Sequence, residues 1–162
     1  MGEFTIPPSN NAAIEIHDDR GGYVDEYESA VWHYNIEGRK VKILGMCRSA
    51  CLLALGAKNV CVGPNAVVMA HMAYEKGTGI IRPDVTARML SSLPHNIKAK
   101  LNGKIKRDYT SAATLRYAEL LSLGIPSCNE NIYASDHKPL KRSEEHTSEL
   151  QSHHDLVCRL LL

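Results

Sequence analysis

The sequence predicts an α/β fold in which a mainly parallel β-sheet is covered by helices. Short apolar or alternating segments are followed repeatedly by longer segments whose apolar residues recur at helical spacing. Strands that alternate with helices favour parallel pairing, because each helix returns the chain to the same end of the sheet. The apolar content of 44% over 162 residues suits one domain with a buried core.

The first part of the chain predicts a strand, a helix and a second strand. Ala13–His17 alternates apolar and polar residues, as a short strand does, and Asp18–Gly22 is a turn signal. Apolar residues over Val24–Tyr34 are spaced as on one face of a helix, which Gly38 is expected to end. Val41–Met46 then predicts a buried strand.

The second part predicts a buried helix, two short strands and two longer helical segments. Ser49–Ala57 is small and apolar throughout, which indicates a helix inside the core. Asn59–Val62 and Val67–Ala70 are short apolar runs of strand length. Pro83–Leu101 is predicted helical with an interruption near Pro94. The remaining expected helix, closed by Gly124 as its C-terminal cap, covers Ser111–Leu123.

Four segments differ in composition and predict the domain organisation. Residues 1–11 contain prolines, a serine and asparagines, which indicates a loose N-terminal segment. The predicted domain covers residues 12–127, and a C-terminal extension covers 128–141. Residues 142–162, RSEEHTSELQSHHDLVCRLLL, resemble a translated short-read sequencing adapter, so we interpret them as an adapter-derived tail outside the fold. We expect the natural chain to continue differently after about residue 141, as in a metagenomic fragment.

Composition argues against several classes of partner. The formal net charge of +1 gives no reason to expect nucleic acid or a membrane surface. No apolar run approaches the roughly 20 residues that a membrane-spanning helix needs. The first residues lack the pattern of a signal peptide, and we leave both the bacterial cytoplasm and the periplasm open as compartments. We expect no cofactor.

The cysteines predict neither a disulfide framework nor a metal site. Their number is odd, with cysteines at 47, 51, 61, 128 and 158. Zinc would need close pairs with a second matching pair or with histidines, and that pattern is absent. We therefore expect buried free cysteines that fill small spaces. A Cys47–Cys51 disulfide would matter only in an oxidising compartment, and Cys47 as the nucleophile would leave Ser49 unexplained.

Ser49 and His71 are the candidate nucleophile and base. Ser49 lies between a predicted strand and a buried helix, where free N–H groups and the positive end of the helix dipole favour negative charge. A serine hydroxyl is a weak nucleophile until a neighbouring base takes its proton. His71 directly follows the strand Val67–Ala70, and histidine suits the role of base because its pKa lies near neutral pH.

Backbone N–H groups near Ser49 are the candidate oxyanion donors. Glycines after a strand can turn an N–H group outward, so Gly21 and Gly22 are candidates together with Ala50. Asp84 and Asp108 are downstream carboxylates. Taken singly, each feature also has an ordinary structural explanation, since paired glycines form turns and a serine caps helices. Their order and spacing together favour a catalytic site.

The run from Ile14 to Tyr74 resembles the Clp protease proteolytic subunit and, more closely, small Clp-like proteins of bacteria. The matching motifs are Gly21-Gly22-Tyr23-Val24, Cys47-Arg48-Ser49-Ala50-Cys51 and Gly63–His71, and the serine and histidine are 22 residues apart. The later stretch Ser111–Ile125 resembles the segment in which that family closes a helix with Gly-Ile or Gly-Leu, so the resemblance covers roughly residues 12–127.

The resemblance implies a ClpP/crotonase-like spiral of ββα units and a serine peptidase that acts on peptides or proteins. It assigns Ser49 as nucleophile, His71 as base and Gly21, Gly22 and Ala50 to the oxyanion site. Asp108 is the nearest plausible acid, and a Ser–His dyad assisted by backbone or water is equally open. The resemblance also implies a homo-oligomer, with any unfoldase partner unidentified.

Three departures from the family motifs keep other functions open. Asp19-Arg20 replaces the Ser-Pro or Thr-Pro before the glycine pair, Arg48 stands where a small residue is usual, and no acid aligns at the expected distance. A non-catalytic scaffold or interaction domain of the same fold is therefore one alternative. A crotonase-type enzyme that acts on acyl-coenzyme A is another.

Overall fold

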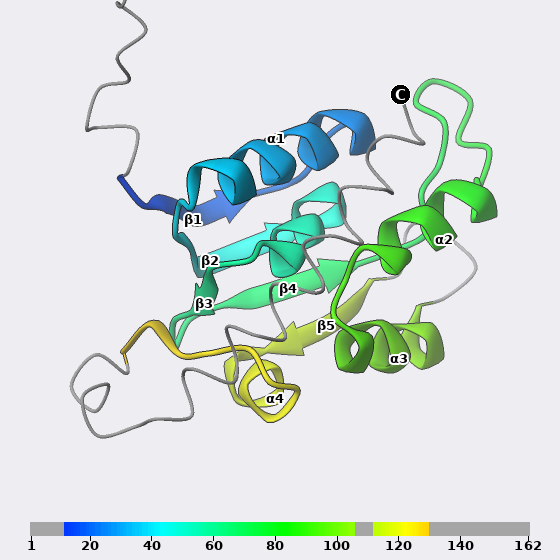
Figure 1. Cartoon of the computed structure of the whole chain (residues 1–162). Helices are drawn as coiled ribbons and strands as arrows, with labels where there is room; N and C mark the ends of the chain where they lie inside the picture. The colour runs from blue at the N-terminus through cyan, green and yellow to red at the C-terminus, as the bar shows by residue number, and fades with distance from the viewer. Residues whose placement is uncertain (1–11, 106–111, 130–162) are drawn as a thin grey trace, which may run out of the picture.

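The computed structural model describes residues 12–105 and 112–129. The expected N-terminal segment, the adapter-like tail, nearly all of the C-terminal extension and the candidate acid Asp108 lie outside the described residues. The elements are, in chain order, β1 (Ile14–Asp19), α1 (Val24–Glu37), β2 (Val41–Arg48), η3 (Ser49–Gly56), β3 (Val60–Val62), β4 (Val67–Ala70), α2 (Pro83–Ser91), α3 (His95–Lys104), β5 (Ala113–Arg116) and α4 (Tyr117–Ser122) (Figure 1).

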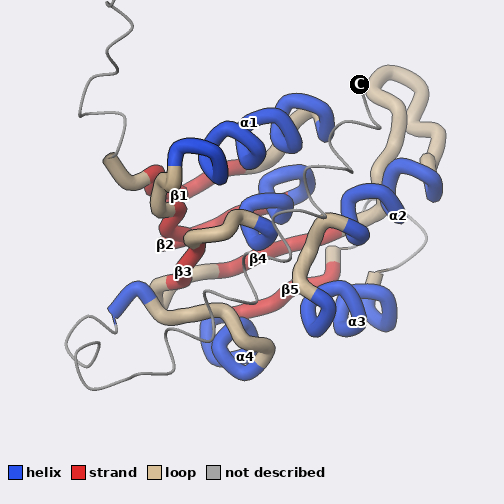
Figure 2. The backbone as a smooth tube through the Cα atoms, in the orientation of Figure 1, coloured by secondary structure: helices blue, strands red, loops and turns tan. Residues whose placement is uncertain are grey.

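The strands form one mostly parallel sheet. Its order is β1-β2-β4-β5, and β3 pairs with β2 outside this path. The pairs β1–β2, β2–β3 and β2–β4 are parallel, and β5 alone runs antiparallel, beside β4. Figure 2 shows the sheet accompanied by helices, with α1 toward the β1 side and α4 toward the β5 side. The predicted α/β class with a mainly parallel sheet is confirmed.

The core lies where β2, β3, β4 and η3 meet. All six residues from Ala50 to Leu55 are buried, so η3 is apolar on every side, as a helix inside a core must be. The sequence predicted a buried helix here, and the segment is a 3-10 helix. The largest fully buried side chains come from seven elements: Val41, Ile43, Leu52, Leu53, Leu55, Val62, Val68, Ile97, Leu101, Leu115 and Leu120.

The helix boundaries follow the sequence signals closely. Helix α1 ends at Gly38, which takes a left-handed conformation with φ +69°, and the N–H of Arg39 donates to the carbonyl of Tyr34. The predicted interruption near Pro94 is confirmed, because α2 ends before it and α3 begins after it. No helix in the described ranges is long and apolar enough to cross a membrane.

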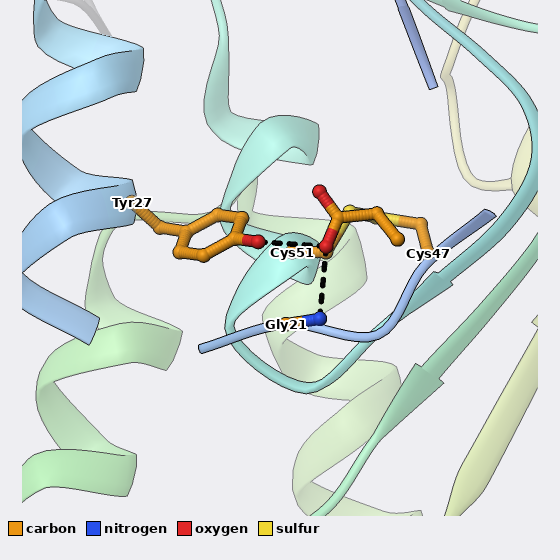
Figure 3. The surroundings of a disulfide bond; sticks show 5 residues. Gly21, Tyr27, Cys47 and Cys51 are labelled. Carbon is orange, nitrogen blue, oxygen red and sulfur yellow. Dashed lines mark hydrogen bonds between the residues drawn. A yellow bond between two sulfur atoms is a disulfide. The ribbon is translucent and has the colours of Figure 1, made fainter. Parts of the chain in front are cut away.

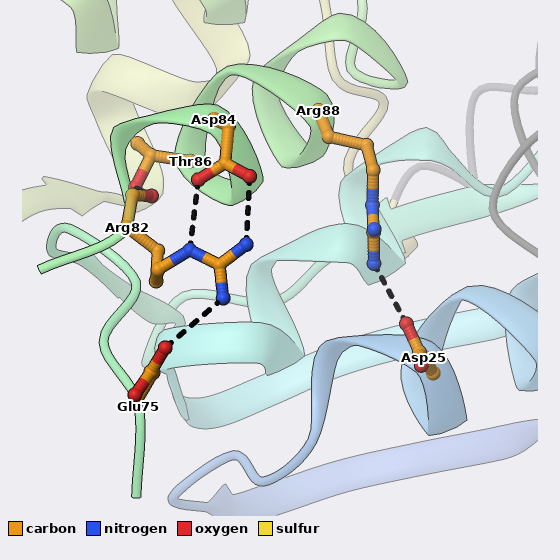
Figure 4. A network of polar contacts seen from close by, with 6 residues as sticks. All are labelled: Asp25, Glu75, Arg82, Asp84, Thr86 and Arg88. Carbon is orange, nitrogen blue, oxygen red and sulfur yellow. Dashed lines mark hydrogen bonds and ion pairs between the residues drawn. The ribbon is translucent and has the colours of Figure 1, made fainter. Parts of the chain in front are cut away.

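Helix α2 is linked to α1 by a charged contact that is partly inside the protein. Glu28 of α1 is only 3% exposed, and burial raises the pKa of its carboxyl group although the Arg88 charge opposes this. Arg88 of α2 lies 2.7 Å from Asp25, as Figure 4 shows, and 3.3 Å from Glu28, so one guanidinium contacts two carboxylates of α1. This arginine therefore supplies positive charge to a buried carboxylate, where an ion is costly to desolvate.

The prediction of a continuous helix over Ser111–Leu123 is wrong in its first half. Ala113–Arg116 forms β5, whose register pairs Val68 with Leu115 and Ala70 with Ala113. Burial alternates along this segment, so Ala113 and Leu115 face the core while their neighbours do not. Of the described residues of this stretch, 112–123, only Tyr117–Ser122 is helical, as α4, and the predicted cap Gly124 has φ +102°.

The expectation of free cysteines is also wrong. Cys47 is bonded to Cys51 across the junction of β2 and η3, and Cys61 is bonded to Cys128. The second pair forms because the Val62–Ser127 bridge brings the residues after α4 alongside β3. The fold alone creates this proximity, which spacing in the sequence does not reveal. Cys158 lies outside the described residues.

Candidate active site

The carboxyl ends of three neighbouring strands, β1, β2 and β4, lie at the same end of the sheet. In the β1–β2 pair Asp19 lies opposite Cys47, and in the β2–β4 pair Arg48 lies opposite Met69. Because β1, β2 and β4 are parallel, the residues that follow them emerge together from the carboxyl ends of the strands. Ligand sites of open α/β sheets are found just beyond the carboxyl ends of the strands.

The residues that emerge there are the candidate site residues. Gly21 and Gly22 follow β1, Ser49 and Ala50 follow β2, and His71 follows β4. Register places the first residue after β2 beside the last residue of β4, so Ser49 and His71 are carried by directly adjacent strand ends. The predicted nucleophile, base and glycine loop therefore all lie at the carboxyl end of the sheet.

Ser49 has an unusual backbone conformation. Its φ is +63°, and it is the one non-glycine residue with positive φ in residues 12–105 and 112–129. The left-handed region costs an L-residue about 1–2 kcal/mol, and such outliers concentrate at functional sites. The turn from β2 into η3 happens at this residue. A serine on a sharp strand-to-helix turn is how α/β-hydrolases present their nucleophile.

The glycine loop packs directly against Ser49. A Cβ atom placed on Gly21 would lie 2.6 Å from the carbonyl oxygen of Arg48, 2.6 Å from the Cβ of Ser49 and 3.0 Å from the backbone nitrogen of Ala50. Gly21 also has φ +91°, which favours glycine independently of the space. Only glycine therefore fits both the conformation and the gap, and the loop after β1 is held against the candidate nucleophile.

The Asp19 side chain organises the glycine loop. Its Oδ1 accepts hydrogen bonds from the backbone N–H of Gly21 at 2.8 Å and from the hydroxyl of Tyr27 at 2.6 Å. Figure 3 shows the Gly21 nitrogen and the Tyr27 hydroxyl bonded to the same group beside the Cys47–Cys51 disulfide. Burial, and then the hydrogen bond to Asp19, raises the pKa of Tyr27 above its ordinary value.

This arrangement corrects the expected role of Gly21. Its N–H group already donates to the Asp19 carboxylate, so it is not available to an oxyanion in this structure. Gly22, the next residue, is exposed. Ala50 is the second residue of η3, and the first N–H groups of a helix have no carbonyl partner within that helix. Gly22 and Ala50 remain as candidate donors.

His71 is buried, and a backbone carbonyl fixes its ring. The side chain is 6% exposed, and Nδ1 lies 2.8 Å from the carbonyl oxygen of Met72. A carbonyl oxygen only accepts, so Nδ1 carries the proton and donates it, and in the neutral ring Nε2 is then an acceptor. This carbonyl orients the ring as the acid of a triad would, which favours the dyad alternative.

Asp84 is occupied elsewhere. It forms two hydrogen bonds to the guanidinium of Arg82, at 3.0 and 2.8 Å, and Arg82 also contacts Glu75 at 3.3 Å (Figure 4). The Arg82 hydrogen bond lowers the pKa of Asp84 to about 2. This exposed cluster fixes the start of α2. Asp84 is therefore not the partner of His71 Nδ1, which is bonded to Met72.

Exposed apolar side chains flank the site. Tyr23 directly follows the glycine pair, and the Lys76 ammonium lies 5.5 Å from the centre of its ring. Tyr74 and Ile80 belong to the loop after His71, and the ring centres of His71 and Tyr74 are 6.0 Å apart. The loop after β4 thus reaches across to the loop after β1, and both present apolar surface to solvent.

The comparisons with known proteins add no family to this geometry. No protein-family model matches the chain, and no curated protein matches it. Within residues 12–105 and 112–129 no group of three or more His, Cys, Asp or Glu residues is placed to hold a metal ion. Any function must therefore be argued from the arrangement at the strand ends.

Sequence reasoning missed three parts of this site. Asp19 and Tyr27 were not predicted as site residues. An aspartate two residues before a glycine is nevertheless a known turn signal, and it points to the hydrogen bond with the Gly21 N–H. The carbonyl of Met72 has no sequence signal at all, because every residue carries a carbonyl group. Its role follows only from the conformation of the chain after β4.

Proposed function

We propose that the chain is a serine hydrolase, and specifically a peptidase resembling the Clp-like class, with Ser49 as nucleophile and His71 as base. The observation that carries this proposal is the left-handed conformation of Ser49 at the end of β2, pressed against Gly21. A purely structural serine at a helix start needs no such conformation, because a capping serine has extended backbone angles. The fold we propose is the ClpP/crotonase-like spiral, and the parallel path β1-β2-β4 supports it.

The proposed reaction follows the order of a serine hydrolase. Ser49 Oγ attacks the peptide carbonyl while His71 Nε2 takes the hydroxyl proton, and Met72 holds the Nδ1–H side of the ring. The negative oxygen is stabilised by the N–H groups of Gly22 and Ala50. The protonated histidine gives its proton to the leaving amine, and water then releases the acyl group by the same steps in reverse.

The surroundings of the site support a peptide substrate with apolar side chains. Tyr23, Tyr74 and Ile80 are large, exposed and placed on the two loops that flank Ser49 and His71. An extended peptide would bury this surface while its backbone reaches the oxyanion donors. Assembly with further copies is part of the same proposal and rests on the resemblance of the sequence alone.

A fluorophosphonate probe tests this proposal directly. We expect the probe to form a covalent adduct with Ser49 in the full chain, and Ser49→Ala to abolish both the adduct and peptide hydrolysis. The matched control is Ser122→Ala, because Ser122 is an exposed helix serine whose hydroxyl donates to Glu119. Unchanged labelling in Ser49→Ala, or no labelling in a folded wild-type chain, would reject Ser49 as the nucleophile.

A non-catalytic interaction domain is the second candidate. The Asp19 carboxylate favours this candidate for two reasons. It accepts the hydrogen bond of the Gly21 N–H, and it brings a negative charge to the glycine loop beside which an oxyanion would form. A negative charge there opposes a second one. Absence of labelling in a chain with native circular dichroism would support this candidate.

A further inference from the structure

The two disulfides occupy different places relative to Ser49. Cys47 lies near the end of β2 and Cys51 in the first turn of η3, so their bond closes the short ring 47–51 around Ser49. Both cysteines are fully buried. The Cys61–Cys128 bond instead joins β3 to the residues after α4, with a sequence separation of 67 residues. Only the first disulfide brackets the candidate nucleophile.

The closed ring contains the sharpest backbone change near the site. Arg48 is extended, with φ −116° and ψ 150°, and Ser49 follows with φ +63°. An unconstrained L-residue would favour the right-handed region over this one. A covalent link between residues 47 and 51 limits the conformations open to the three residues between them, which favours keeping Ser49 in the left-handed region.

The ring also contacts the glycine loop. Cys47 lies opposite Asp19 in the β1–β2 register, and Asp19 holds the N–H of Gly21. Gly21 in turn has no space for a Cβ between the Arg48 carbonyl and Ser49. A change in the path of residues 48–50 would therefore displace the nucleophile and the oxyanion loop relative to each other.

We propose that Cys47 and Cys51 are positioning residues whose disulfide holds Ser49 in its reactive conformation, so that activity at Ser49 depends on the thiol–disulfide state of this pair. This inference rests on the proposed hydrolase function. In the reducing step a dithiol compound gives two electrons and two protons, the Cys47–Cys51 sulfur–sulfur bond becomes two thiols, and the dithiol becomes a cyclic disulfide.

The test uses the full chain with Cys158→Ser, which removes the one cysteine outside the two disulfides. The protein is incubated with graded dithiothreitol, free thiols are alkylated, and peptide mapping gives the reduced fraction of each disulfide. Fluorophosphonate labelling rate, kcat and KM are measured on the same samples. Cys128 is partly exposed and Cys61 is buried, so the second disulfide serves as an internal control in every sample.

We expect kcat and the labelling rate to fall roughly 10- to 100-fold as Cys47–Cys51 is reduced, because a displacement of about 1 Å can cost 10²-fold in rate. We expect KM to change little, the far-UV circular dichroism to remain native, and reoxidation to restore the rate. Reduction of Cys61–Cys128 alone should leave the labelling rate unchanged. A rate that follows Cys61–Cys128 instead would overturn the proposal.

A double variant provides a second route to the same answer. Cys47→Ala with Cys51→Ala should reproduce the loss of kcat without any reductant, and Cys61→Ala with Cys128→Ala should keep the wild-type labelling rate. Equal labelling of oxidised, reduced and doubly substituted chains would reject the positioning role while leaving the hydrolase proposal intact. No labelling of the oxidised wild type would reject the hydrolase proposal itself. Loss of circular dichroism together with activity would show a general structural role and also overturn the inference.

Discussion

At the scale of single residues, the backbone conformation of Ser49 lowers the stability of the fold, whereas its hydroxyl group is needed for the proposed chemistry. Its positive φ is a cost to the fold that an ordinary surface serine does not carry. The hydroxyl at this position is what the proposed reaction requires, so stability and activity should respond in opposite directions to substitution.

Ser49→Gly is the substitution that shows this opposition. Glycine adopts positive φ without the steric cost, so we expect the free energy of unfolding to rise by about 1 kcal/mol and the melting temperature by roughly 4 °C. Hydrolysis and fluorophosphonate labelling should be lost. Thermal unfolding of wild type, Ser49→Gly and Ser49→Ala makes the comparison, since alanine keeps the steric cost. A glycine variant no more stable than the alanine variant would contradict this account.

At the scale of elements, the connection from β1 to α1 depends on one carboxylate. Asp19 ends β1, and its side chain joins the turn at Gly21 to Tyr27 in the first turn of α1. The glycine loop is thereby fixed from both sides. This is a positioning role, because Asp19 acts on the site through Gly21.

We expect Asp19→Ala to lower kcat about tenfold with KM little changed, because the loop loses the acceptor that fixes Gly21. Asp19→Asn should restore most of the rate, since its side-chain oxygen can still accept from the Gly21 N–H while the charge is removed. Tyr27→Phe is the matched control that keeps the Gly21 contact. Steady-state kinetics with a peptide substrate checks all three. Equal loss in the alanine and asparagine variants would assign the effect to charge instead.

The elements also show what the sequence could predict and why it could not predict the rest. Helix α1, the break near Pro94 and the strands around Ser49 were predicted because periodicity and turn residues are local signals. β5 was missed because its strand conformation depends on pairing with β4. The paired residues Val68 and Leu115 are 47 positions apart in the sequence, and only the fold brings them together. The candidate site was predicted where side-chain chemistry marked it, at Ser49 and His71.

The parts of the site that escaped prediction are backbone and tertiary features. The sequence suggested the Gly21 N–H as an oxyanion donor, but the structure gives that group to Asp19. The sequence favoured free cysteines because their number is odd. A Cys47–Cys51 disulfide was considered but not favoured, and the Cys61–Cys128 pair becomes visible only when the strands are placed. A motif can therefore locate a site, while the partner of each polar group comes from the fold.

At the scale of the whole molecule, the Cys61–Cys128 disulfide ties the end of the described chain to the centre of the sheet. It links β3 to the residues after α4, beside the bridge between Val62 and Ser127. A link that closes a loop this long removes much conformational freedom from the unfolded chain. Its effect should therefore appear in the stability of the entire domain rather than at the candidate site.

We expect Cys61→Ala with Cys128→Ala to lower the free energy of unfolding by about 4 kcal/mol, as the loop-closure argument gives for a separation of 67 residues. Cys47→Ala with Cys51→Ala should cost less, because that ring spans only four residue steps and restricts the unfolded chain little. Urea unfolding of the full chain, followed by circular dichroism, measures both variants against wild type. Together with the labelling rates, this gives a crossed pattern in which one disulfide controls stability and the other controls reactivity. If the short-ring variant proved the less stable of the two, the Cys47–Cys51 bond would be a structural staple of the β2–η3 junction, and the separation of roles between the two disulfides would not hold.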